Sequence, residues 1–172
     1  MNKVSLKEYV DTYKDFPKKN ILFRDLSPIF GNPKLLSELI YEMSNIDFCK
    51  NAEAIIAIDA RGFLFGSMIS MYLSKPMVLA RKPGKLPGEL ISKQYSLEYG
   101  NNSLSLQKKA IQKYNSFVIV DDIIATGGTV QCLSDLISSQ NKVVTGLNVV
   151  LELADLKGRD KFKFPVSSQL KY

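Results

Sequence analysis

The sequence predicts an α/β protein built on a mostly parallel sheet, and three observations support this fold class. From residue 53 onward, short apolar runs alternate with stretches of helical periodicity, which is typical of parallel strands covered by helices. One apolar run leads directly into a turn of small residues and then into a helix start. The chain of 172 residues is 45% hydrophobic and 23% charged, which suits one compact domain.

The second half of the chain is predicted to supply the strands and helices of this sheet. Strands are predicted for four apolar runs, residues 54–58, 77–80, 117–120 and 143–151. Helices are predicted for residues 62–73, 104–114 and 130–139. Because the carboxyl ends of parallel strands lie at one edge of a sheet, we expect ligands to bind there. Residues 83–102 carry Gly, Pro, Ser, Asn and charge without a stable period, which predicts a long mobile functional loop.

The region before residue 53 is predicted to be mainly helical. The sequence Ser5-Leu6-Lys7-Glu8 has the spacing of a capping box and predicts a helix that ends at Phe16-Pro17. A second helix is predicted to begin at Asn32-Pro33. Its apolar face consists of Leu35, Leu36, Leu39, Ile40 and Met43. The segment 21–30 between them is neither clearly helical nor a clean strand.

The absence of histidine limits the chemistry that this chain can perform. A sequence without histidine excludes Ser-His triads, Cys-His dyads and zinc sites with imidazole ligands. Any acid or base is therefore a carboxylate, lysine, tyrosine or cysteine. Cys49 and Cys132 form no CxxC pair, which indicates reduced, buried thiols in a cytoplasmic protein. No secretory signal or membrane-spanning run is visible, so we expect a soluble protein without a membrane partner.

The basic excess of the chain is concentrated in one short stretch. There are 23 basic and 17 acidic residues, which gives a net charge of +6. Half of this excess lies in residues 81–93, which contain Arg81, Lys82, Lys85, Lys93 and one acid, Glu89. Such a cluster fits a small polyanion as well as a nucleic acid. Because the aromatic-interleaved patches of an RNA-binding sheet are missing from the sequence, we expect no nucleic-acid partner.

The most informative segment is residues 117–129, FVIVDDIIATGGT, in which an apolar strand ends in two acids and leads through a small-residue turn into a helix. Glycine lets a ligand approach the backbone, and a helix N-terminus offers N–H groups and a positive dipole end. The predicted ligands of a phosphate monoester are Ala125, Thr126, Gly127, Gly128 and Thr129. Asp121 and Asp122 point to opposite sides, where they either accept hydrogen bonds from vicinal hydroxyls or lie near a hydrated Mg²⁺. The alternative is an ordinary turn with a solvated acidic pair.

Two further turns are predicted at the same edge of the sheet. Asp59-Ala60-Arg61-Gly62 follows the strand at 54–58, and its backbone N–H groups and planar guanidinium suit phosphate oxygens. The basic segment that starts at Arg81 follows the strand at 77–80. Converging cations stabilise negative charge that develops on a leaving group. Either turn alone would be interpreted as a solvated surface loop.

The segment 117–129 resembles the signature of the phosphoribosyltransferases, which bind 5-phosphoribosyl-1-pyrophosphate (PRPP). The resemblance implies that Asp121, Asp122 and residues 125–129 bind this substrate. It implies that its pyrophosphate is bound by Asp59, Ala60, Arg61, Arg81, Lys82 and Lys85. It also implies the type I fold of this family, with a central sheet flanked by helices. Residues 1–172 would then form a single domain with a small hood (about 1–50), a core (about 51–172) and a flexible catalytic lid (about 83–103).

Two more motifs are similar to those of family members that act on adenine. The hexapeptide Y-S-L-E-Y-G at 95–100 resembles their lid, which implies that Tyr95, Glu98 and Tyr99 belong to the lid and that Glu98 is the acid/base group. The motif F-R-D-L-S-P at 23–28 resembles their base-binding segment. This implies that Phe23 stacks on adenine, while main-chain groups of Leu22 and Arg24 read its edge. An L-K-G-R at 156–159 also matches, whereas residues 101–105 are less acidic than is usual.

The resemblance as a whole implies a cytoplasmic homodimer that converts adenine and PRPP into AMP and pyrophosphate in purine salvage. Glu98 and Arg61 are the expected catalytic residues. Mg²⁺ is the expected cofactor, held through substrate and water without direct protein ligands. Two alternatives remain. A sister enzyme for another base should lack both adenine motifs, and a regulator that senses PRPP and binds nucleic acid usually carries an added DNA-binding segment.

Overall fold

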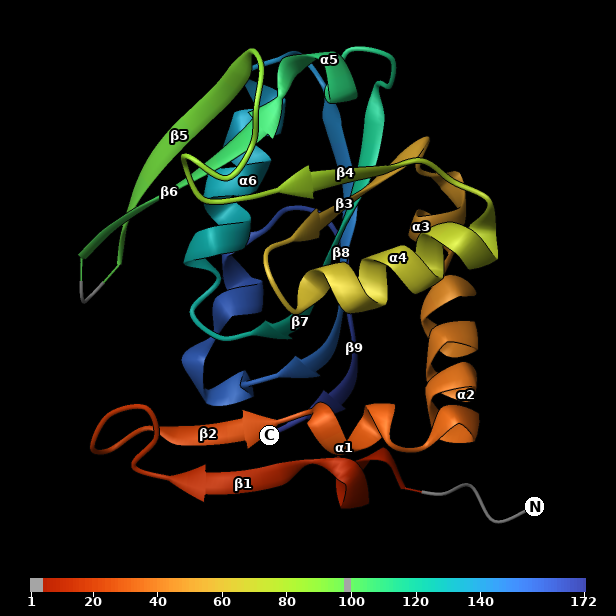
Figure 1. Cartoon of the computed structure of the whole chain (residues 1–172), viewed down its shortest axis with the longest axis vertical. Helices are drawn as coiled ribbons and strands as arrows, with labels where there is room; N and C mark the ends of the chain where they lie inside the picture. Colours follow the sequence, from red (N-terminus) through yellow and green to blue (C-terminus); the bar gives the residue numbers. More distant parts are fainter. Residues whose placement is uncertain (1–4, 98–99) are drawn as a thin grey trace. The chain divides into compact units, whose positions relative to one another are not determined.

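The computed structural model describes residues 5–97 and 100–172, and of residues 94–97 and 100–102 it describes the backbone only (Figure 1). The chain divides into two compact units, Met1–Glu42 and Met43–Tyr172, and each is described by itself. The first unit contains a two-stranded hairpin and short helices. The second contains a five-stranded sheet and an additional hairpin.

The first unit begins with one turn of 3-10 helix, η1 (Leu6–Tyr9), followed by strands β1 (Asp11–Lys14) and β2 (Leu22–Asp25). These strands form an antiparallel hairpin in which Tyr13 lies opposite Phe23. The prediction of a helix up to Phe16-Pro17 is therefore wrong. Ser5 makes no side-chain cap hydrogen bond, so the capping-box spacing is present without the capping contact that would extend the helix.

The remaining helices of the first unit are α1 (Ser27–Phe30) and α2 (Pro33–Ser44), whose last two residues belong to the second unit. The Asp25 carboxylate accepts hydrogen bonds from the Ser27 N–H and hydroxyl, at 2.9 and 2.6 Å, just before α1. The prediction of a helix starting at Asn32-Pro33 is confirmed. The Asn32 side chain accepts a hydrogen bond from the Leu35 N–H at 3.2 Å, as a helix cap should.

The second unit is built on a parallel sheet with strand order β4-β3-β7-β8-β9. These strands are β3 (Ala54–Ile58), β4 (Met77–Ala80), β7 (Ser116–Ile124), β8 (Val143–Glu152) and β9 (Val166–Lys171). The predicted α/β class is confirmed, since every described pairing in this sheet is parallel. Two details differ from the prediction. Strand β7 continues beyond Val120, so Asp121 and Asp122 lie within it, and β9 was not predicted.

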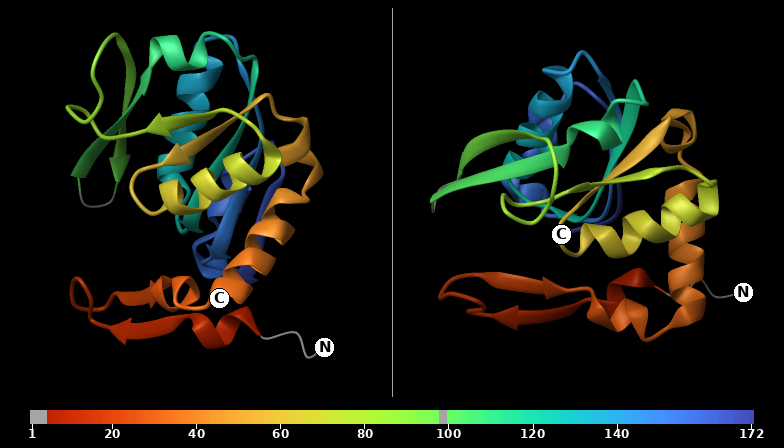
Figure 2. Two further views of the ribbon diagram at one scale, coloured as in Figure 1. Left: turned by 45° about the vertical axis from the view of Figure 1, so that its right-hand side comes forward. Right: turned by 45° about the horizontal axis from the view of Figure 1, so that its top comes forward.

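Helices cover both faces of this sheet (Figures 1 and 2). Helix α4 (Gly62–Leu73) connects β3 to β4, and helix α6 (Gly128–Ser138) connects β7 to β8. The two connections run in opposite directions along the sheet, so right-handed crossovers place these helices on opposite faces. The smaller helices are α3 (Asp47–Asn51), α5 (Lys108–Ile111), η2 (Ala154–Leu156) and η3 (Gly158–Lys161).

The irregular loop predicted for residues 83–102 is contradicted by strands β5 (Leu90–Leu97) and β6 (Gly100–Gln107). These two strands pair antiparallel. The prediction of a helix over 104–114 is also wrong, because α5 is a single turn. Leu104 and Leu106 are buried in the core, and Ser105 forms a backbone bridge to Arg81, which ties this strand to the end of β4.

Both cysteines are free thiols and buried, as expected. Burial raises the pKa of the Cys49 thiol to about 12 and also raises the pKa of the Cys132 thiol. Within the described part of the chain, no helix is long and apolar enough to cross a membrane.

Candidate functional site

Two of the predicted turns leave neighbouring strands of the sheet at the same edge. Strand β3 pairs with β7 in parallel, with Ala57 opposite Val120. The β3–α4 turn and the β7–α6 turn therefore both follow carboxyl ends of adjacent strands. This is where parallel α/β sheets bind ligands.

The β7–α6 turn encloses a hollow of about 110 Å³. Its lining residues are Asp121, Ile123, Ile124, Ala125, Thr126, Gly127, Gly128, Thr129 and Val130. Gly127 has a φ of +77° and precedes the first turn of α6, a conformation that glycine adopts without the strain of a side chain. The hollow thus faces the N–H groups at the start of a helix, which bind phosphate groups in many proteins.

The two acids of β7 have different surroundings. Asp122 is only 6% exposed, and its Oδ2 lies 2.6 Å from Nε of Arg61. Asp121 lines the hollow, and its Oδ1 accepts a hydrogen bond from the Asp122 N–H at 2.9 Å. Burial and then the adjacent Asp122 carboxylate raise the pKa of Asp121 well above its usual value. Asp121 is thus among the residues that line the hollow, and Asp122 is not.

Gly62 allows the two turns to approach each other. A Cβ added at Gly62 would lie 2.8 Å from Asp121 Oδ1 and 3.0 Å from the Val120 carbonyl oxygen. Such distances are shorter than van der Waals contact, so a larger residue would displace the Asp121 carboxylate. Gly66, one turn later, similarly faces Ala57, whose Cβ would lie 2.5 Å from an added methyl group.

The β3–α4 turn carries charged side chains. The Asp59–Ala60 peptide bond is cis. Arg81 donates a hydrogen bond from Nε to Asp59 Oδ2 at 2.9 Å and another to the Lys85 carbonyl oxygen at 3.2 Å. Lys82 and Lys85 are exposed. The structure thus brings Arg81 to the β3–α4 turn, and it places Arg61 of this turn against Asp122 of the neighbouring strand.

The predicted adenine-binding residues lie in the hairpin of the first unit. Leu22 is exposed at 44%, and the ring of Phe23 packs edge-on against Phe16 with centroids 5.1 Å apart. Arg24 donates a hydrogen bond to Thr12 Oγ1 at 2.5 Å. Phe23 and Arg24 therefore each contact another side chain of the first unit.

The predicted lid falls partly outside the described residues. Tyr95 lies in β5 and pairs with Asn102 of β6 in the backbone register. Glu98 and Tyr99 lie outside the described residues. The base of the hairpin is anchored on α6, where Lys93 Nζ lies 2.7 Å from Asp135 Oδ2.

A group of residues that contacts the β7–α6 turn was not predicted. A Cβ added at Gly158 would lie 2.1 Å from the Ala125 carbonyl oxygen, and one added at Gly127 would lie 3.0 Å from Cζ of Phe162. Gly158 belongs to the L-K-G-R motif noted in the sequence, but its contact with a turn about thirty residues earlier has no local sequence signal.

Comparison with known proteins agrees with this geometry. The family described as "Phosphoribosyl transferase domain" matches residues 29–164. A protein of Prochlorococcus marinus (strain MIT 9515) named adenine phosphoribosyltransferase is 61% identical over 96% of both chains. Another with that name, from Mycoplasmopsis agalactiae, is 44% identical over 91% of both chains.

Solved structures show the same likeness. The adenine phosphoribosyltransferase of Thermoanaerobacter pseudethanolicus superposes with a TM-score of 0.91 at 36% identity, covering 98% of this chain and 100% of that one. The Saccharomyces cerevisiae enzyme, solved with adenine and an imino-altritol bisphosphate, gives a TM-score of 0.84 at 37% identity over 95% of both chains. The chain therefore belongs to the phosphoribosyltransferase family, and within it to the adenine phosphoribosyltransferases.

Proposed function

We propose that this protein transfers the phosphoribosyl group of PRPP to adenine, which yields AMP and pyrophosphate in purine salvage. The bond between ribose C1′ and the pyrophosphate oxygen breaks, a bond from C1′ to N9 of adenine forms, and N9 loses its proton. The observation that carries the proposal is the hollow at the β7–α6 turn, which combines a helix N-terminus with the Asp121 carboxylate at a sheet edge. The relatives named adenine phosphoribosyltransferase support it.

In this proposal the β7–α6 turn binds the ribose 5-phosphate part of PRPP. Backbone N–H groups and hydroxyls of Ala125 to Thr129 donate hydrogen bonds to the 5′-phosphate, because they line one hollow at the positive end of a helix. Asp121 faces the same hollow and accepts hydrogen bonds from ribose hydroxyls. Asp122 contributes to ribose binding once Arg61 turns from it towards substrate.

The β3–α4 turn binds the pyrophosphate in this proposal. Asp59 and Ala60 present backbone groups, and Arg61 and Arg81 add guanidinium forks that match phosphate oxygens. The exposed Lys82 and Lys85 extend the positive field. Because pyrophosphate gains negative charge as it leaves, these cations stabilise the transition state more than the ground state.

In this proposal residues 22–24 bind adenine, and Glu98 accepts its proton. Phe23 stacks on the purine, and main-chain groups of Leu22 and Arg24 bind its edge. With no histidine in the chain, a carboxylate is the natural base for N9. Tyr95 and Tyr99 flank Glu98 in sequence and would help to exclude water from the reacting ribosyl centre.

Mg²⁺ is proposed as the cofactor, bound chiefly through the substrate. No group of three or more acidic or cysteine side chains that would hold a metal ion occurs among the described residues. In this proposal Mg²⁺ takes its ligands from substrate oxygens and water, and the Asp121 carboxylate, which faces the hollow, binds ribose hydroxyls and not the ion. When bound, the ion neutralises charge on the pyrophosphate.

A cytoplasmic homodimer is also proposed, and helix α4 offers the supporting observation. Its sequence GFLFGSMISMYL contains no charged residue, yet Leu64 and Met71 are exposed at 47% and 79%. These residues are seven apart and lie on one face of the helix. Apolar faces of this kind are typical of an interface between subunits.

The proposal is tested by a chromatographic assay with Mg²⁺, PRPP and one base at a time: adenine, hypoxanthine, guanine, xanthine or orotate. We expect a nucleotide product, AMP, from adenine alone. The variant Glu98→Gln should lose turnover by about 100-fold or more while still binding PRPP. Glu89→Gln is the matched control, because Glu89 is an exposed acid directly before β5 that pairs with Lys108. Product from another base, or none from adenine, would contradict the proposal.

A further inference from the structure

Behind the β7–α6 turn, an ion cluster fixes the residues that follow strand β8. Glu152 ends β8 and is only 5% exposed. Its carboxylate accepts hydrogen bonds from Nε of Arg159 at 2.8 Å, from a terminal guanidinium nitrogen of Arg159 at 2.5 Å and from the Ser168 hydroxyl at 2.6 Å. The hydrogen bonds from Arg159 lower the pKa of Glu152 to about 2, so the pair is charged throughout the physiological range.

The guanidinium of Arg159 is held from more than one side. Its other terminal nitrogen donates a hydrogen bond to the carbonyl oxygen of Val166 at 2.5 Å. Val166 is the first residue of strand β9. Arg159 therefore joins the end of β8 to the start of β9, with η3 between them. A planar fork that makes such directed contacts fixes the backbone from which it extends.

That backbone is in direct contact with the phosphate-binding turn. Gly158 precedes Arg159, and a Cβ added there would lie 2.1 Å from the Ala125 carbonyl oxygen and 3.0 Å from the Gly127 nitrogen. In return, a Cβ added at Gly127 would lie 2.8 Å from the Gly158 carbonyl oxygen. The backbones of Gly127 and Gly158 thus pack directly against each other. A side chain at either position would collide with the facing backbone.

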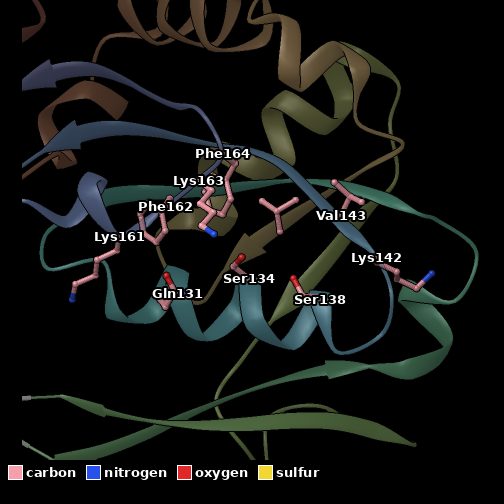
Figure 3. A pocket seen from close by; sticks show the side chains of 10 residues that line it. Gln131, Ser134, Ser138, Lys142, Val143, Lys161, Phe162, Lys163 and Phe164 are labelled. Carbon is pink, nitrogen blue, oxygen red and sulfur yellow. The ribbon is translucent and has the colours of Figure 1, made fainter.

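An aromatic pair borders the same turn on its other side. Phe162 and Phe164 stack with centroids 4.9 Å apart and ring planes 8° apart. Figure 3 shows both rings beside helix α6, in the wall of a pocket of about 460 Å³ that also contains Ser134 of this helix. Phe162, the residue after η3, also approaches the turn, because a Cβ added at Gly127 would lie 3.0 Å from its Cζ.

We propose that Arg159 is a positioning residue for 5′-phosphate binding: paired with Glu152, it presses Gly158 against Ala125 and Gly127 and so holds the turn in its phosphate-binding conformation. This inference rests on the proposed function. Arg159 itself touches no substrate. Its effect is specific to one part of PRPP, because Gly158 contacts the β7–α6 turn and the pyrophosphate turn lies after a different strand.

The test compares two probes, ribose 5-phosphate and inorganic pyrophosphate, by calorimetry. The variant Arg159→Lys keeps the charge but loses the fork, and Glu152→Gln keeps the shape of the acceptor but loses its charge. We expect each to bind ribose 5-phosphate about tenfold more weakly and pyrophosphate as tightly as the wild type. Lys161→Gln is the matched control, since Lys161 is an exposed cation of the same η3 turn and should change neither affinity.

Kinetics and a second variant separate positioning from stability. Arg159→Lys should raise KM for PRPP with little change in KM for adenine, whereas general destabilisation would change both. Gly158→Ala should weaken ribose 5-phosphate binding more strongly, because its methyl group displaces the Ala125 carbonyl. Unchanged ribose 5-phosphate affinity in folded Arg159→Lys and Gly158→Ala would overturn the inference. Failure of the wild type to bind ribose 5-phosphate would instead overturn the proposed function.

Discussion

The β3–α4 turn and the β7–α6 turn leave adjacent strands of one sheet, yet they are built from different chemistry. The first carries Arg61 and receives Arg81 through its hydrogen bond to Asp59. The second, from Ala125 to Thr129, contains no charged side chain and offers backbone N–H groups and hydroxyls at a helix start. Both suit phosphate oxygens, one through cationic side chains and the other through backbone groups.

This difference matches the fates of the two phosphate groups in the proposed reaction. Pyrophosphate leaves and gains charge, so cations on side chains that can follow it are useful. The 5′-phosphate stays on the ribose from substrate to product, so a rigid cradle holds it equally well throughout. Four experiments test whether the β3–α4 turn acts through its positive charge and the β7–α6 turn through the shape of its backbone.

The largest expected effect comes from removal of charge from the first turn. Arg61→Ala should lower kcat by about 100-fold or more, because the leaving pyrophosphate loses a cation. The buried Asp122 also loses its ionic partner, so the variant should melt at a lower temperature. Steady-state kinetics and thermal unfolding measure the two effects. The double variant Arg61→Ala/Asp122→Asn should recover stability but not kcat, and full activity in Arg61→Ala would contradict the role of this cation.

The next effect concerns shape where the two turns meet. Gly62→Ala should raise KM for PRPP about tenfold, because its methyl group pushes against Asp121 and distorts the ribose site. Gly66→Ala is the matched control on the same helix, where the methyl group meets Ala57 instead. It should lower the melting temperature with little change in KM. If both variants shift KM equally, the contact between Gly62 and Asp121 has no special part in binding.

A smaller effect concerns how much the charged Asp121 carboxylate destabilises the fold. When folding raises the pKa of a carboxyl group, the folded protein becomes less stable as the pH rises from the ordinary pKa of that group, about 3.9, through its pKa in the folded state. Asp121→Asn has no such titration, so it should unfold at a temperature a few degrees higher at pH 8 and at nearly the wild-type temperature at pH 4. It should also bind ribose 5-phosphate more weakly. A variant less stable than wild type at pH 8 would show that the carboxylate stabilises the ligand-free fold.

The smallest effect is a difference in salt dependence. Interactions of exposed cations such as Lys82 and Lys85 are screened by salt more than those of buried backbone groups. Between about 0.05 and 0.5 M NaCl, pyrophosphate affinity should therefore fall by a larger factor than ribose 5-phosphate affinity, both measured by calorimetry. Equal slopes for the two ligands would indicate that both turns bind through the same kind of interaction.

The sequence predicts the parallel sheet well because its strands are buried on both faces. Runs such as 54–58 and 117–120 are wholly apolar, and every residue of β3 is buried. The positions of the β3–α4 and β7–α6 turns were also predicted, since each follows an apolar run that the sequence shows directly. These features could be predicted because each depends on residues that are close together in the sequence.

The wrong predictions of secondary structure in the two hairpins, and the missed contacts of Gly158, depend on residues that are distant in sequence. Leu104 and Leu106 are spaced as in a strand, but the polar residues between 90 and 103 concealed the pairing of β5 with β6. Tyr13 lies in a strand because it pairs with Phe23 across a hairpin. The contact of Gly158 with Gly127 likewise arises only when β8 returns beside β7, so neither segment reveals it alone.

The burial of both thiols makes the chain suitable for site-specific labelling. Cys49 and Cys132 are 0% and 2% exposed, and burial keeps them protonated and unreactive towards maleimides, because the thiolate is the nucleophile. A cysteine introduced at an exposed position such as Lys113 would therefore carry a single fluorophore on the unmodified background. Fluorescence from that position would report ligand binding in real time without removal of either native cysteine.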